Sequence, residues 1–192
     1  MKSVYKKIAG LTFALCATSA HAGLLSFEDI NPGSNLDVIN NYGGFSFGGD
    51  GPSLVFDASQ QANGLKNAAI DGVNAVLNFS GHDIIMRWLG NSLINFDGGY
   101  WVSDSNDSLI SFEGWRDGQQ IFNSGMFTLN DTQATHIQLG WSQIDQIVIK
   151  THSPTVWGMD ALSFTQVPTP TTPALLMLGG LGLLLNRKKS TR

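Results

Sequence analysis

The residues most capable of chemistry are three histidines, His82, His136 and His152, which occur among many serines and aspartates. Hydrolysis needs an activated nucleophile or a paired acid and base. The chain contains no His-Glu-x-x-His or Walker-type glycine motif. His136 alternates with Thr135 and Ile137 on a predicted strand and is expected to face solvent, and His82 follows a Ser-Gly turn. We therefore predict no catalytic residue and a protein that is not an enzyme.

Aromatic side chains offer a second kind of chemistry, because an exposed ring can stack on the apolar face of a sugar. The chain has five tryptophans. Trp141 and Trp157 lie in regular strand patterns and are expected in the core. Tyr100, Trp101 and Trp115 lie beside Asp-Gly turns, and we predict that these three bind a ligand. The alternative is that all the tryptophans fill the core.

The sequence between residues 23 and 166 predicts the elements that position these side chains. Short apolar runs alternate with Gly, Asn, Asp and Ser, and about ten strands are expected. Asp97-Gly98 and Asp117-Gly118 are predicted hairpin turns. A helical turn is expected only within Ala58–Ala69. Many short strands at close spacing predict an all-β protein with a single β-sandwich or jelly-roll domain.

The N-terminus reads as a secretory signal peptide over residues 1–22. Three lysines precede an apolar stretch, and Ala20 and Ala22 supply the small residues that signal peptidase requires. We expect export by the Sec machinery and a mature chain that begins at Gly23. The single cysteine, Cys16, lies within this segment, so the mature chain has no disulfide and no cysteine-based metal site.

Charge separates the middle of the chain from its ends. Residues 23–166 contain all fifteen acidic residues and only four basic ones, which gives a formal net charge of −11. Nucleic-acid and anionic-lipid binders need a basic surface. We therefore expect no nucleic-acid partner and a domain suited to the extracellular medium.

Residues 167–192 form a tail with three parts in order. Pro168-Thr169-Pro170 begins a proline-rich spacer, residues 174–185 form an apolar run, and Arg187, Lys188 and Lys189 follow it. Twelve apolar residues in a helix span about 18 Å, which is short of the roughly 20 residues of a membrane span. The basic end is expected on the cytoplasmic side of the inner membrane.

This three-part tail resembles the PEP-CTERM sorting domain, whose proteins are processed by exosortases in Gram-negative bacteria. The family motif is Pro-Glu-Pro, and this chain has threonine at its centre. The resemblance implies a precursor held in the inner membrane, cleavage by an exosortase-type transpeptidase, and a mature form at the cell surface or in a biofilm matrix of exopolysaccharide. The alternative is a plain C-terminal membrane anchor.

Three segments resemble jelly-roll, galactose-binding-like domains and carbohydrate-binding modules: Phe27-Glu28-Asp29 with Tyr42–Phe45, Phe112–Gly118, and Trp141–Ile147 with Trp157–Leu162. In such modules a structural calcium often joins the first strand to the last. The resemblance implies Glu28 and Asp160 as calcium ligands, with Asp29 as a weaker candidate. The alternative is that both are exposed edge residues.

Together these observations predict three segments: a signal peptide (1–22), a β-sandwich domain (23–166) and a sorting tail (167–192). The expected function is that of an exported, non-catalytic binding or structural module associated with extracellular polysaccharide. The alternative function is that of a secreted glycan hydrolase or lyase.

Overall fold

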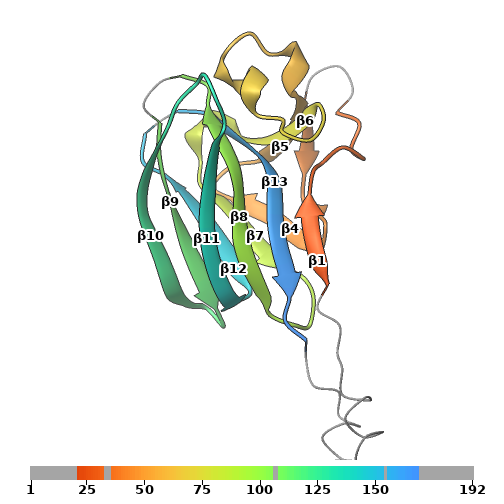
Figure 1. The fold of residues 1–192 in the computed structure, drawn as a ribbon, viewed down its shortest axis with the longest axis vertical. Coiled ribbons are helices and arrows are strands. Elements are labelled where there is room, and N and C mark those ends of the chain that lie inside the picture. The colour runs from red at the N-terminus through yellow and green to blue at the C-terminus, as the bar shows by residue number, and fades with distance from the viewer. Residues whose placement is uncertain (1–20, 33–35, 106–107, 154, 169–192) are drawn as a thin grey trace, which may run out of the picture. The chain divides into compact units, whose positions relative to one another are not determined.

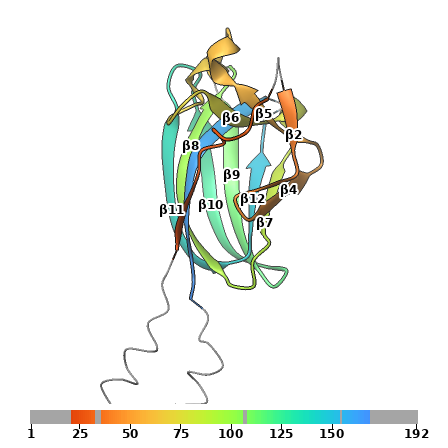
Figure 2. The same ribbon diagram turned by 90° about the vertical axis from the view of Figure 1, so that its right-hand side faces the viewer.

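Two antiparallel β-sheets lie face to face in this protein (Figures 1 and 2). The computed structural model describes residues 21–32, 36–105, 108–153 and 155–168. Sheet A has the strand order β11-β8-β13-β6-β5-β2, with β1 beside β13, and sheet B has the order β10-β9-β12-β7-β4-β3. The predicted all-β sandwich is therefore confirmed for the described part of the chain.

The bounds of the strands follow the apolar runs of the sequence. Sheet A consists of β1 (Ala22–Leu25), β2 (Leu36–Ile39), β5 (Ser53–Asp57), β6 (Asn74–Asn78), β8 (Ile94–Ser103), β11 (Thr135–Ile144) and β13 (Trp157–Gln166). Sheet B consists of β3 (Asn41–Tyr42), β4 (Phe45–Gly49), β7 (Ile84–Trp88), β9 (Ser108–Arg116), β10 (Gln119–Leu129) and β12 (Gln146–Thr151). The described residues contain three 3-10 turns, η1 (Ala58–Gln60), η2 (Gly64–Asn67) and η3 (Phe79–Gly81). The helical turn expected within 58–69 is therefore confirmed, whereas the expectation that no other occurs is wrong, because η3 lies outside that range.

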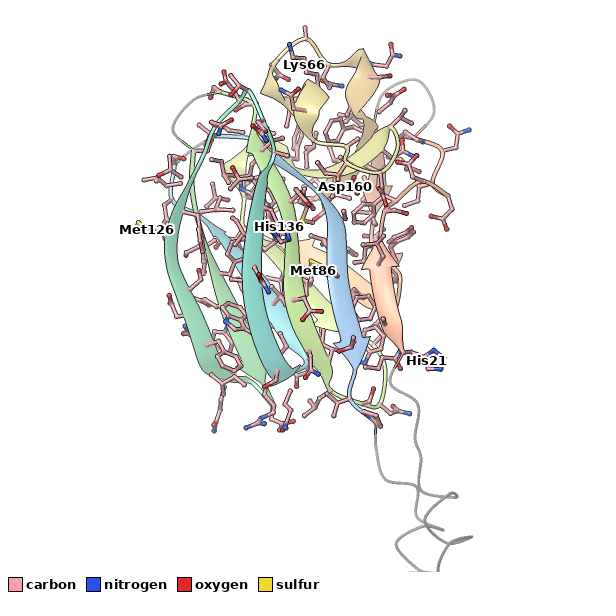
Figure 3. The ribbon with its side chains drawn as sticks, viewed as in Figure 1. His21, Lys66, Met86, Met126, His136 and Asp160 are labelled. Carbon is pink, nitrogen blue, oxygen red and sulfur yellow. The ribbon has the colours of Figure 1, made fainter. Side chains whose placement is uncertain are left out.

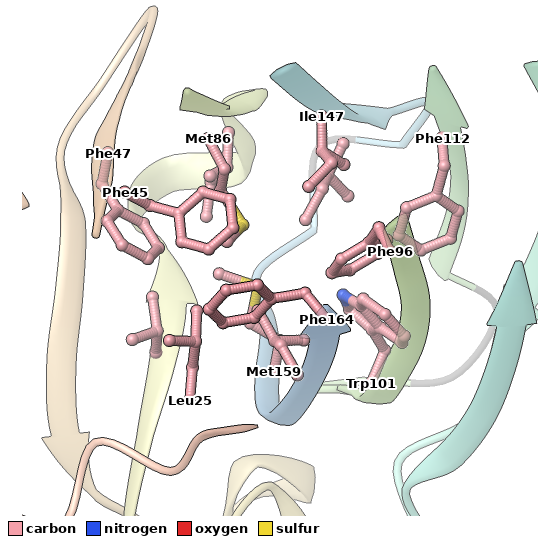
Figure 4. Packing of buried hydrophobic residues seen from close by; sticks show 14 of the residues in the cluster. Leu25, Phe45, Phe47, Met86, Phe96, Trp101, Phe112, Ile147, Met159 and Phe164 are labelled. Atoms are coloured by element: carbon pink, nitrogen blue, oxygen red, sulfur yellow. The ribbon is translucent and has the colours of Figure 1, made fainter. Parts of the chain in front are cut away.

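The main core lies between the sheets, where the inward side chains of both meet (Figure 4). Trp101 of sheet A packs edge-on against Phe112 of sheet B, with ring centroids 4.7 Å apart. Phe164 meets Phe45 in the same way at 5.0 Å. Such aromatic pairs add about 0.5–1.5 kcal/mol each beyond the area they bury. They hold together a sandwich that contains no disulfide, because the single cysteine of the chain, Cys16, precedes it.

A second hydrophobic cluster lies on the outer face of sheet A. There η2 and the residues after it place Leu65 and Ala68 over Phe56 and Val102, which point away from the main core. No comparable cluster covers the outer face of sheet B in the described ranges. Sheet B therefore presents an open outer surface, whereas sheet A is partly closed.

The two predicted Asp-Gly turns have different outcomes. Asp117 and Gly118 join β9 to β10 with φ of 51° and 75°, so this hairpin is confirmed. The prediction for Asp97-Gly98 is wrong, because both residues lie inside β8. Gly98 has φ of 135° and interrupts the register with β13, and a Cβ on it would lie 2.0 Å from the Ile137 carbonyl oxygen. Gly98 therefore lies at an irregularity within a long strand and not in a turn.

The two ends of the sandwich chain lie side by side. β1 pairs antiparallel with β13, with Ala22 opposite Thr165, and the Gln166 amide donates to the His21 carbonyl oxygen at 2.9 Å. The predicted processing residues Ala22 and Gly23 lie in β1, and Pro168 is the last described residue. The others (Ala20, Thr169, Pro170, Arg187, Lys188 and Lys189) lie outside the described residues. Within the described ranges, no helix is long and apolar enough to cross a membrane.

Candidate functional site

The outer face of sheet B is built by strand alternation. In β12 the side chains of Ile147 and Ile149 enter the main core. Those of Gln146, Val148 and Lys150 therefore point outward, because successive side chains of a strand face opposite sides of the sheet. Val148 is buried yet belongs to neither hydrophobic cluster, so it lies in the floor of this outer face.

Strand register aligns four side chains in one row across this face. Trp115 of β9 lies opposite Gln146 of β12. Gln146 lies opposite Arg87 of β7, which in turn lies opposite Ser46 of β4. Directly opposed side chains in antiparallel strands are close neighbours. The fold thus assembles an aromatic ring, an amide, a guanidinium and a hydroxyl, and we call these four residues the sheet B row.

Trp115 is held in place by its own strand. Its side chain is half-buried, and its Nε1 donates to Glu113 Oε2 at 3.0 Å. Residues two apart on a strand share a face, so this bond holds the indole along the outer surface of β9. The ring is fixed before any ligand arrives, which lowers the entropy cost of stacking.

The polar side chains of this face are also tied to one another. Arg87 Nε and Nη2 donate to Gln146 Oε1 at 3.2 and 2.9 Å. Lys150 Nζ lies 3.0 Å from Asp83 Oδ2, and this hydrogen bond is the main cause of the raised pKa of Lys150. Asp83 Oδ1 accepts from the Thr151 amide at 2.7 Å. The face is a preorganised polar surface with an aromatic ring in it.

The structure separates the three predicted ligand-binding residues. Trp101 is fully buried in the main core against Phe112, so its assignment as a binding residue is wrong. It lies in the middle of β8 and faces inward, because the expected turn beside it does not form. Tyr100 is half-buried on the outer face of sheet A, 4.7 Å from the exposed ring of His136. Tyr100 and Trp115 thus belong to opposite faces of the sandwich.

Asp160 and Glu28 meet at one loop although they are far apart in the sequence. Asp160 is fully buried under residues 70–74, and its Oδ2 accepts from the Ile70 amide at 2.7 Å (Figure 3). Its Oδ1 has no hydrogen-bond partner. Burial is the largest cause that raises the pKa of Asp160 to about 7, and the charge of Asp71 adds to the rise. A carboxylate with one unpaired buried oxygen is costly unless a proton or a cation is bound.

Glu28 holds the other end of the same loop. Its Oε1 accepts from the amides of Val73 and Asn74 at 3.0 and 2.7 Å. A Cβ at Gly72 would lie 2.1 Å from Glu28 Cδ, so a larger residue there would displace the Glu28 carboxylate from the loop amides. Asp29 is occupied elsewhere, since its Oδ1 accepts from the Tyr42 hydroxyl. Burial and then Asp29 raise the pKa of Tyr42 to about 12.

A calcium ion at Glu28 and Asp160 stays a prediction. The unpartnered Oδ1 of Asp160 fits a cation, because calcium is bound by carboxylate and carbonyl oxygens. In the described ranges, no group of three or more His, Cys, Asp or Glu side chains could hold a metal ion. Calcium here would therefore need backbone carbonyl oxygens for the rest of its coordination.

One serine–histidine pair is present on the outer face of sheet B. Ser111 Oγ lies 2.7 Å from His152 Nε2. A nucleophilic site also needs a group that orients the histidine, and in the part of the chain that is described no carboxylate binds the His152 ring. His136 contacts Tyr100, and the carbonyl oxygen of His82 accepts from Asn78. The three histidines therefore do not form a common site.

A polar pocket of about 630 Å³ lies among η2, Asp104–Ser105 and Asp131–Thr132. Asn67 donates to the Asp131 carbonyl oxygen and joins two of these segments. None of the lining residues is aromatic. The pocket therefore offers hydrogen bonds but no ring on which a sugar could stack, unlike the sheet B row.

Sequence reasoning missed Arg87, Gln146 and Glu113. A signal was present for Arg87, since it is one of four basic residues in 23–166 and interrupts the apolar run Ile84–Trp88. Gln146 and Glu113 gave no signal of their own. Their role depends on the pairing of β12 with β9 and β7, which are distant in the sequence.

No protein-family model and no curated protein matches this chain. Its fold is similar to a family 29 carbohydrate-binding module, CBM29_1 from Piromyces equi, at 15% identity and a TM-score of 0.46, over 78% of this chain and 93% of that one. It is also similar to the CBM22-1 xylan-binding domain from Paenibacillus barcinonensis, at 12% identity and 0.46, over 80% and 99%. A family two carbohydrate esterase from Cellvibrio japonicus matches at 14% and 0.34, over 80% and 36%. At these identities and scores the likeness says nothing of a ligand or site.

The raised pKa of Asp160 predicts a pH-dependent stability in the absence of metal. Between about pH 4 and 7 the folded protein keeps a proton that the unfolded chain has lost, so the free energy of unfolding falls as pH rises through this window. Asp160→Asn should flatten that part of the profile. Urea unfolding in chelator at several pH values measures it, with Asp37→Asn on exposed β2 as control. Equal slopes for wild type and Asp160→Asn would contradict the prediction.

Calcium binding predicts a chelator-sensitive melting temperature. A ligand that binds only the folded state stabilises it by mass action, so removal of calcium should lower the thermal midpoint. Glu28→Gln and Asp160→Asn retain acceptors for the loop amides and should each weaken this response. Differential scanning calorimetry in calcium and in chelator tests it. Identical wild-type melts under both conditions would show that the carboxylates hold the loop alone.

Proposed function

We propose that this protein is an exported, non-catalytic module that binds an extracellular polysaccharide through the outer face of sheet B. The observation that carries the proposal is the sheet B row. It places a fixed indole beside amide, guanidinium and hydroxyl groups on a face that no second hydrophobic cluster covers. Sugars need this combination, because each pyranose has an apolar face and a rim of hydroxyl groups.

The row has the dimensions for an extended chain of sugars. Neighbouring strands lie about 4.8 Å apart, so the three intervals from β9 to β4 span roughly 14 Å. A short oligosaccharide laid across the strands would place one ring on Trp115. Its next unit would reach Gln146 and the Arg87 guanidinium bonded to it, and a later unit would reach Ser46. Recognition would thus extend along a polymer and not stop at a chain end.

The carboxylates of this face favour binding over hydrolysis. Glycoside hydrolysis uses two carboxyl groups on either side of the scissile bond, one of them with a raised pKa. Glu113 accepts from Trp115, and both oxygens of Asp83 are engaged by β12. Asp160, the carboxyl group with the raised pKa, is fully buried away from this face. The alternative, a glycan hydrolase or lyase, remains an outcome of the test below.

Trp115→Ala should weaken polysaccharide binding at least about tenfold, because loss of a tryptophan anchor costs on the order of 2 kcal/mol. Affinity electrophoresis or calorimetry against a glycan panel measures this. Tyr100→Ala is the matched control, since it removes the half-buried aromatic ring of the opposite face. If Tyr100→Ala abolishes binding and Trp115→Ala does not, the site lies on sheet A. Release of new reducing or unsaturated ends by wild type would establish an enzyme.

Export and sorting belong to the same proposal. Signal peptidase would cut after Ala22, and an exosortase-type enzyme would act on the tail near Pro168-Thr169-Pro170. The first cut removes the first residue of β1 and leaves Gly23–Leu25 opposite Leu162–Phe164. The mature N-terminus would therefore still be anchored by β13. The protein would pass from the inner membrane to the cell surface or the extracellular matrix.

The sorting proposal predicts that the surface form begins at Gly23 and lacks residues 174–192. The apolar run is too short for a stable span, and the proline-rich spacer is an accessible substrate. Replacing Pro168 and Pro170 by alanine should trap a membrane-bound precursor. Intact-mass spectrometry of surface and membrane fractions tests this. A wild-type surface form that retains the apolar run would identify the tail as a simple anchor.

A further inference from the structure

Arg87 carries a positive charge that no described group neutralises. Its exposed guanidinium bonds to the neutral side chain of Gln146, through Nε and Nη2. The only ion pair in the described residues joins Lys150 to Asp83. Gln146 therefore fixes the direction of the guanidinium and leaves its charge, the Nη1 donors and the second Nη2 hydrogen for another partner.

Cationic side chains are rare in this domain. Residues 23–166 hold fifteen acidic residues and only four basic ones, so carboxylates for pairing are abundant. Three of the four basic residues, Arg87, Arg116 and Lys150, belong to strands of sheet B. Arg116 donates to Gln143 and is followed by Asp117 in the hairpin turn. Among these, Arg87 is the one in the sheet B row.

Guanidinium chemistry defines the ligand group. The planar fork of arginine matches a carboxylate through two parallel N–H···O bonds, and such charge-assisted bonds are stronger than bonds to hydroxyl groups. We propose that Arg87 binds the carboxylate of a uronic acid, so that the ligand is an acidic polysaccharide. This inference rests on the proposed function, because it assigns the substrate class of the same face.

The other end of the row indicates where the acidic sugar lies. Glu113 is bonded to the Trp115 indole, so a carboxylate stacked on that ring would meet a like charge. The Arg87 guanidinium is bonded to Gln146, the residue directly opposite Trp115, so it reaches toward the first strand beside that ring. Neighbouring strands are about 4.8 Å apart, which is close to the length of one sugar unit, so the guanidinium lies beside the unit next to the one on Trp115. The face therefore fits a neutral sugar on Trp115 and a uronate at Arg87, as in a polymer that alternates acidic and neutral units.

The negative net charge of the domain opposes binding of an anionic polymer only weakly, because most of the acidic residues are distant from a ligand on sheet B. Exposed charges more than about 8 Å apart are largely screened at physiological ionic strength. Salt screens both the attraction to Arg87 and the repulsion from the whole domain. Salt dependence is thus a poor test, and removal of the ligand's carboxylate is a direct one.

The experiment uses the protein purified from its producing cells and two polymers. Hyaluronan alternates glucuronate with a neutral sugar, and polygalacturonate is acidic at every unit. Each is compared with its carboxyl-reduced form, which has the same backbone. Wild type should bind native hyaluronan about tenfold more tightly than reduced hyaluronan, since hydrogen bonds to charged groups are the stronger kind. The preference should be smaller for polygalacturonate.

Three variants separate this inference from the proposed function. Arg87→Gln should erase the preference for the native polymer, and Arg87→Lys should keep part of it, because it retains the charge without the fork. Lys66→Gln, in η2, makes the same charge change away from sheet B and should keep the full preference. Equal wild-type affinity for native and reduced polymers, with both lost in Trp115→Ala, would overturn the uronate assignment and leave glycan binding intact. A preference that persists in Arg87→Gln would also overturn it.

Discussion

Backbone pairing among β9, β12, β7 and β4 is the constraint on which the proposed binding face depends. The inward side chains Phe112, Ile147 and Met86 fix the register of these strands from inside the core. A slip of one residue would turn those side chains to solvent and the outward ones to the core. The burial of the core thus places Trp115 and Arg87 on the outer surface, whatever contacts they make there.

The two outer faces of the sandwich are used differently. Sheet A is partly covered by η2 and the loop after it, and that loop is held at its ends by the carboxylates of Asp160 and Glu28. A buried carboxylate has a cost, which binding of a proton or of calcium would offset. Sheet B has no such cover in the described ranges. The stability of one face and the binding proposed for the other therefore depend on separate parts of the fold.

The sequence was enough for the fold class, because alternation and turn residues are local signals. It predicted the hairpin at Asp117-Gly118 but misread Asp97-Gly98, since β8 is paired on both sides and uses its glycine where the Ile137 backbone approaches. The sequence gives only a weak signal for β2, because it is a short edge strand with exposed Leu36 and Val38. In the proposed site on sheet B, Trp115 was predicted from the sequence as a ligand-binding residue. The partners Arg87 and Gln146 were not, because they meet it only through pairing between strands distant in the sequence.

The position of β13 determines how a mechanical load would enter the molecule. β13 is the last strand before residue 167, and it pairs with β8 on one side and with β6 and β1 on the other. Tension applied at Val167 along this strand would act parallel to it, so the hydrogen bonds on both sides would share the force in shear. An edge strand pulled from its end would instead open bond by bond. A polymer held on sheet B could therefore be pulled by flow while the C-terminal strand keeps its place.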